Sequence, residues 1–104
     1  MKNIVIHFVL SSEDETVYND FQEIIKNFDI HFEKLSFSPV RPYARMNDHC
    51  EGNITCTIHG DDFEKFKQLL ADHFDECEED EFETYSIWSK MCHSNLYYLL
   101  IQVI

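Results

Sequence analysis

The sequence has few residues that interrupt regular structure and few positive charges. Its 104 residues include two glycines, two prolines and eight Lys or Arg side chains. So little glycine excludes the glycine-rich loop with which many nucleotide-binding sites hold phosphate. The shortage of basic residues disfavours nucleic acid and anionic membranes as direct partners, because proteins bind both largely through Lys and Arg.

Long apolar segments and paired cysteine motifs are also missing. The C-terminal segment LYYLLIQVI extends for nine residues, far short of the roughly 20 that a membrane-spanning helix needs. The N-terminal segment lacks the small-residue cleavage site of a signal peptide, so we expect a cytoplasmic protein. The four cysteines have no CxxC spacing, and in a reducing compartment we expect all of them to be free thiols; they are Cys50, Cys56, Cys77 and Cys92.

The residues that are present favour a folded chain. Hydrophobic residues make up 44% of the sequence and aromatic residues 14%, which is the profile of a globular protein rather than of a disordered acidic tail. The length suits one hydrophobic core. We therefore predict a single domain over residues 1–104 and assign its acidity to a folded surface.

The first half of the chain predicts a strand, a helix and a loop. In residues 2–10, apolar side chains occupy both of the alternating faces of an extended chain, which predicts a central strand covered on two sides. Ser12 and Glu15 have the spacing of a capping box and predict a helix from near Glu13. Residues 29–37 fit either a continuation of this helix or a short strand, and Pro39 and Pro42 end the segment in both cases. Apolar residues at helical spacing are Val17, Phe21, Ile24, Ile25, Phe28 and Phe32.

The second half predicts a strand, a helix and a hairpin. Residues 53–59 alternate as a half-exposed strand that places Cys56 among buried residues. Asp61 and Glu64 predict the start of a second helix, and residues 81–104 predict a hairpin. The fold class is therefore α+β, with a mixed, mostly antiparallel sheet of four to five strands and two helices packed on it. A ferredoxin-like arrangement is the nearest known one.

Negative charge is concentrated in the second half of the chain. The formal net charge is −12, and eight of the twelve residues from Asp72 to Glu83 are carboxylates. Such clustering strengthens the field that attracts a basic partner but adds self-repulsion to the fold. If Phe82 and Trp88 face the core, Tyr85 lies beside carboxylates on the other face. The predicted partner-binding surface comprises Asp72, Asp75, Glu76, Glu78, Glu79, Asp80, Glu81, Glu83 and Tyr85; the simpler interpretation is a solubilising surface.

No constellation of residues predicts catalysis, a cofactor or a metal site. The segment HCEGNITCTIH contains His49, Cys50, Cys56 and His59, but structural zinc sites usually take ligand pairs two to four residues apart on a tight turn. Neighbouring Cys92 and His93 point in opposite directions in an extended chain, which disfavours a nucleophile and base pair. We expect a protein without catalytic turnover.

In size, acidity and class the chain resembles the immunity proteins of bacterial toxin systems, including those of contact-dependent growth inhibition. No motif carries the resemblance. It implies a cognate toxin as partner, most simply a nuclease whose cationic active site is covered by carboxylates. Two alternatives stay open: an anti-CRISPR or other nucleic-acid mimic, and a ligand- or metal-binding regulatory domain of ferredoxin-like type that uses Cys50, Cys56 or the histidines.

Overall fold

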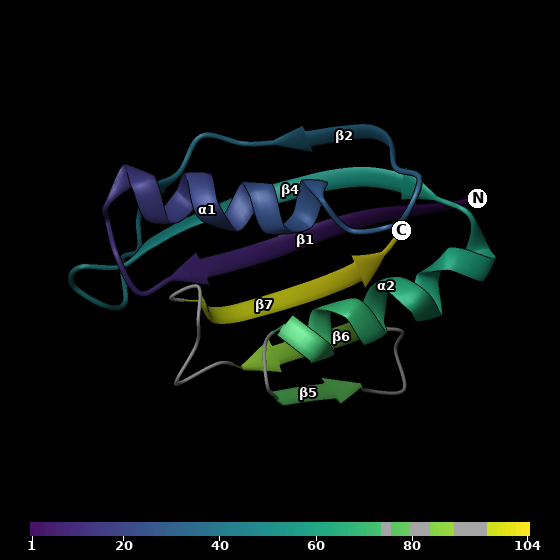
Figure 1. The fold of residues 1–104 in the computed structure, drawn as a ribbon. Helices are drawn as coiled ribbons and strands as arrows, with labels where there is room; N and C mark the ends of the chain where they lie inside the picture. The colour runs from purple at the N-terminus through teal and green to yellow at the C-terminus, as the bar shows by residue number, and fades with distance from the viewer. Residues whose placement is uncertain (74–75, 80–83, 89–95) are drawn as a thin grey trace.

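The computed structural model describes residues 1–73, 76–79, 84–88 and 96–104, and for residues 73, 76–79, 84–88 and 98 it describes the backbone alone. Its elements follow one another along the chain as drawn in Figure 1. They are β1 (Lys2–Leu10), α1 (Glu15–Lys26), β2 (Glu33–Phe37), β3 (Arg41–Pro42), β4 (Cys50–Ile58), α2 (Gly60–His73), β5 (Glu76–Glu79), β6 (Thr84–Trp88) and β7 (Leu96–Val103).

The sheet confirms the α+β class but is larger than the four to five strands expected. Six strands lie in the order β2-β4-β1-β7-β6-β5, and the two-residue β3 pairs with β4 beside β2. Every pairing between described strands is antiparallel. The predicted hairpin is present as β6 paired with β7. The unexpected addition is β5, which lies within the acidic run and forms one edge of the sheet.

The connections between the central strands explain this order. β1 and β2 are joined through α1, and β4 lies between them; β4 and β7 are joined through α2, and β1 lies between them. Two such interleaved βαβ units are the connectivity of a ferredoxin-like arrangement. The β5–β6 hairpin is inserted between α2 and β7, so it lengthens the sheet beyond β7.

Both helices lie on one face of the sheet (Figure 1). On this face the side chains of Ile4, Ile6 and Phe8 are buried, whereas Val5 and His7, on the opposite face of β1, are only half-buried. The expectation that β1 is central is confirmed by its place between β4 and β7. The expectation that it is covered on both sides is met only in part: no described helix lies over the second face, yet Val9 on that face is fully buried.

The start of α1 differs from the predicted capping box. The N-cap residue is Asp14, whose Oδ1 accepts hydrogen bonds from the backbone N–H and the hydroxyl of Thr16, both at 2.9 Å. Ser12 instead accepts a hydrogen bond from the backbone N–H of Asp14 at 3.0 Å. Asp and Ser are both good N-cap residues, and the spacing alone did not distinguish between them. The helix thus begins at Glu15, two residues later than expected.

The open question about residues 29–37 is resolved in favour of a strand. Residues 33–37 form β2, which pairs with β4 in a register that shifts between Glu33 and Ser36. Lys34, within this irregular stretch, has a φ of 55°. The second helix begins at Gly60, so Asp61 lies in its first turn rather than at its cap. Neither described helix is long and apolar enough to cross a membrane.

The core depends on the contact between the Phe8 ring of β1 and Gly52 of β4. Gly52 on β4 lies opposite Phe8 on β1, and the Phe8 ring occupies the space where a Cβ on residue 52 would be. A Cβ at Gly52 would lie 2.7 Å from Cζ of Phe8 and 3.2 Å from Oγ of Ser38. The Phe8 ring also packs on Tyr18 and Phe21 of α1, with centroid distances of 5.5 and 4.8 Å. Because residue 52 has no side chain, the Phe8 ring can occupy this position, and α1 can pack on the sheet against it.

This contact generates a stability prediction. Gly52→Ala should lower the free energy of unfolding by about 1–3 kcal/mol, because overpacking displaces the Phe8 ring. Gly60→Ala is the matched control: a Cβ there would meet only Cε of Lys2 at 3.9 Å, so stability should change by less than about 0.5 kcal/mol. Urea unfolding of both variants measures the difference. Equal stability of the two would show that the Phe8 contact places no limit on residue 52.

Candidate functional site

The structure places part of the predicted acidic surface at one edge of the sheet. Asp72 lies in the last turn of α2 with an exposed side chain, and its Oδ1 accepts a hydrogen bond from Nε2 of Gln68 at 2.8 Å. Glu76, Glu78 and Glu79 belong to β5, the outermost strand, for which the backbone is described. The remaining predicted carboxylates lie outside the described residues; they are Asp75, Asp80, Glu81 and Glu83.

The backbone register of β6 bears on the predicted role of Tyr85. Position 85 lies opposite Ile101, and position 88 lies opposite Tyr98. Directly opposed positions of an antiparallel pair belong to the same face of the sheet, and Ile101 is fully buried on the face that the helices cover. Position 85 therefore belongs to the sheet face that the helices cover, and position 88 belongs to the opposite face. The face is therefore the reverse of the one predicted, although position 85 still lies directly opposite Glu79 of β5.

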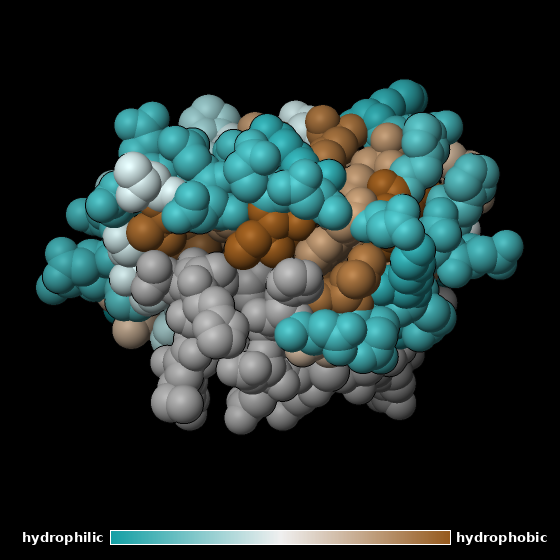
Figure 2. Space-filling model, in the orientation of Figure 1, coloured by the Kyte–Doolittle hydropathy of each residue, from teal (hydrophilic) through white to brown (hydrophobic). Residues whose placement is uncertain are grey.

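Carboxylates are also abundant over the two helices. The side chains of Glu15, Asp20 and Glu23 on α1 are exposed, as are those of Asp61 and Glu64 on α2. Figure 2 shows the resulting mainly hydrophilic surface over the helices, with hydrophobic residues visible between them. The negative field of the molecule therefore extends beyond the run from Asp72 to Glu83.

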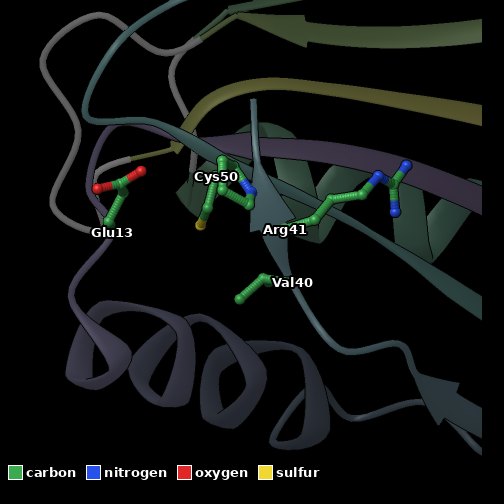
Figure 3. Close-up of a pocket in the computed structure, with 5 residues that line it drawn as sticks. Glu13, Val40, Arg41 and Cys50 are labelled. Carbon is green, nitrogen blue, oxygen red and sulfur yellow. The ribbon is translucent and has the colours of Figure 1, made fainter. Parts of the chain in front are cut away.

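A second candidate site is a pocket where α1, β3 and β4 begin. It has a volume of about 310 Å³ and is lined by Glu13, Val40, Arg41, Pro42 and Cys50. We call it the Glu13 pocket. Figure 3 shows the Glu13 carboxylate beside the pocket and the Arg41 side chain extending away from Glu13. An apolar wall, a carboxylate and a thiol thus meet at one end of the sheet.

Hydrogen bonds from α1 and β4 hold the loop that forms the pocket. The Tyr18 hydroxyl donates to the backbone oxygen of Ser38. Ser38 N–H donates to the oxygen of Asn53 at 2.9 Å, and Asn53 N–H donates to Ser38 Oγ at 2.9 Å. Further along, Tyr43 N–H donates to the oxygen of His49 at 2.9 Å. The loop is therefore fixed to the sheet on both sides of Val40.

An ion pair holds the Arg41 side chain. Its Nε lies 2.8 Å from Oε1 of Glu51, which is directly opposite Arg41 in the register of β3 and β4. The second carboxylate oxygen of Glu51 lies 3.5 Å from Nε2 of His7 on β1. The Glu51 side chain is only 18% exposed. The one guanidinium that lines the pocket is therefore already paired with a carboxylate.

The two cysteines whose side chains are described, Cys50 and Cys56, are buried free thiols. Burial raises the pKa of Cys56 to about 11. Burial, together with the nearby Glu13 carboxylate, also raises the pKa of Cys50. A thiol must lose its proton to attack an electrophile or to bind a metal. Among the described residues, no group of three or more His, Cys, Asp or Glu side chains is placed to hold a metal ion.

The Glu13 pocket was not predicted from the sequence, in which no pattern gives a role to Glu13 or Val40. Pro39 and Pro42 mark a rigid loop. Neither described helix begins near them in the sequence, since α1 begins at Glu15 and α2 at Gly60. The pocket itself depends on long-range pairing, because Glu13 and Cys50 come together only when β1 and β4 are side by side.

The buried thiol of Cys56 generates a pH prediction. The folded state keeps this proton up to about pH 11, whereas an unfolded thiol loses it near its ordinary pKa of about 8.5. Unfolding is therefore favoured increasingly as the pH rises between these values. Urea unfolding at pH 8 and pH 10.5 should show a smaller loss of stability for Cys56→Ala than for the unaltered protein. Equal losses would place the Cys56 thiol in a water-like environment.

Comparisons with known proteins give no relative from which a role could be transferred. No family model matches the chain, and no curated protein or solved structure is significantly similar to it.

Proposed function

We propose that this protein is a non-catalytic binding protein whose acidic surface covers the cationic site of a basic partner. The most specific form of the proposal is an immunity protein that blocks the active site of a cognate nuclease toxin in the cytoplasm. The observation that carries it is the charge: the formal net charge is −12, and three residues of the acidic run form most of the edge strand β5.

The position of β5 suits such a role. An edge strand is bordered by only one other strand, so its outer side is open to a second molecule. A regular strand also fixes its residues at a constant spacing of about 3.4 Å. A strand with this sequence offers negative charge to Lys and Arg side chains that would otherwise bind phosphate.

The alternatives to an immunity protein differ in the partner or ligand that they require. Cys50 and Cys56 are protonated thiols, and no metal-binding group of three residues is present among the described side chains. A nucleic-acid mimic would use the same physics against a different basic groove, and it differs from an immunity protein in the identity of the partner. The metal-binding alternative would require ligands from outside the described residues.

The acidic edge generates a binding prediction. The partner is first identified by co-purification from the native host with mass spectrometry. Changing Glu76, Glu78 and Glu79 together to Gln should then slow association about tenfold at low salt, because steering by the field is weakened. The effect should shrink as added salt screens the charges. Stopped-flow measurement of the association rate over a series of salt concentrations tests this.

A matched control removes equal charge from another element. The variant with Glu15→Gln, Asp20→Asn and Glu23→Gln also loses three carboxylates, all of them exposed on α1. It should slow association less than the β5 variant. If both variants remain folded and slow association equally, the general charge of the molecule acts rather than the β5 edge. If neither has an effect, the acidic run is a solubilising surface only.

A further inference from the structure

We propose that the Glu13 pocket accepts one cationic side chain, a Lys or an Arg, from a bound partner. The aliphatic part of that side chain would pack against Val40, Pro42 and Cys50, and its charged group would lie beside the Glu13 carboxylate. The inference rests on the proposed function for the presence of a basic partner, but it concerns a different part of the surface from β5.

The size of the pocket favours a single side chain. Its volume of about 310 Å³ lies at the lower end of the range of about 300–1,000 Å³ in which proteins hold small molecules. Val40 is half-buried and Cys50 is 5% exposed, so these two residues give the pocket a firm apolar part beside its polar lining. Lys and Arg combine a long aliphatic stem with a charged end, and they bury the stem readily.

The charges around the pocket favour a cation. Glu13 is exposed and makes no hydrogen bond or ion pair with any residue that the structure describes. The positive charge of Arg41 is directed away from Glu13 (Figure 3) and is paired with Glu51 at 2.8 Å. The Cys50 thiol is neutral because burial raises its pKa. Among the residues that the structure describes, the local charge that remains for a ligand is therefore the Glu13 carboxylate.

The nearby start of α1 does not convert the pocket into an anion site. A helix N-terminus carries the equivalent of roughly half a positive charge. Asp14 already accepts the hydrogen bond from the Thr16 N–H, and Glu15 lies in the first turn. With Glu13, three consecutive carboxylates surround this end of the helix. Their combined negative charge exceeds the helix dipole, so an anion would be repelled.

The test uses small probes that carry a single side chain. Nα-acetyl-lysine methylamide and Nα-acetyl-arginine methylamide are titrated into the full chain and followed by the backbone amide signals of Val40, Arg41 and Cys50. The uncharged Nα-acetyl-norleucine methylamide has a similar stem without the charge. Saturable shifts are expected, with the cationic probes binding up to about fivefold more tightly than norleucine, as one partly exposed ion pair provides.

Three variants examine the roles of the charge and the wall. Glu13→Gln should abolish the preference for the cationic probes. Glu15→Gln is the matched control, because it removes a neighbouring carboxylate that does not line the pocket, and it should retain the preference. Val40→Phe should fill the pocket and weaken the binding of all three probes. The proposal is overturned if no probe binds, if norleucine binds as tightly as lysine, or if Glu15→Gln and Glu13→Gln lose the preference equally.

The same variants separate this inference from the proposed function. If an identified partner binds the Glu13→Gln and Val40→Phe variants normally but binds the β5 variant more weakly, the pocket proposal fails and the proposed function stands. If the probes bind as expected but the β5 variant associates with its partner unchanged, the role of the acidic edge fails and the pocket proposal stands.

Discussion

The packing of Phe8 over Gly52 is the contact on which the rest of the structure depends. The Phe8 ring lies over Gly52 of the neighbouring strand, where a side chain would displace it, and it contacts Tyr18 and Phe21 of α1. The Tyr18 hydroxyl in turn holds the backbone of Ser38. One aromatic contact in the core therefore determines where α1 lies and where the loop with Val40 begins.

The electrostatic organisation is set by the same arrangement of layers. Both helices cover one face of the sheet (Figure 1) and carry exposed carboxylates, and the surface over them is mainly hydrophilic (Figure 2). Water and salt screen such charges, so their mutual repulsion costs the fold little. The few basic residues are used locally: Arg41 pairs with Glu51, and Lys65 pairs with Asp29 at 3.2 Å. Most of the negative charge is thus left available to act on other molecules.

Sequence patterns predicted the elements better than their contacts. Helical periodicity located both helices, and strict alternation placed Cys56 on the buried face between Ile54 and Ile58. The patterns were insufficient where two local choices had similar energies. Asp14 and Ser12 are both suitable N-cap residues, and residues 33–37 became a strand only because β4 was available to pair with them.

The acidic strand and the pocket needed information that no local window contains. Glu-rich segments have low strand propensity, and β5 forms because β6 provides a partner for it. The sheet face to which Tyr85 belongs depends on the register between β6 and β7. A shift of that register by one residue would move every residue of β6 to the other face. The Glu13 pocket likewise joins residues that are 37 positions apart in the sequence.

The inserted hairpin changes which strand ends the sheet. Without β5 and β6, the border would be β7, whose sequence LYYLLIQV is apolar and rich in residues that favour strands. A long apolar border invites the strands of other chains to add to it, as in fibrillar aggregates. Here β6 pairs with β7, and the sheet ends at β5, a short strand in which three of four residues are glutamate. The insertion therefore places a long apolar strand inside the sheet and leaves a short, negatively charged strand at the border.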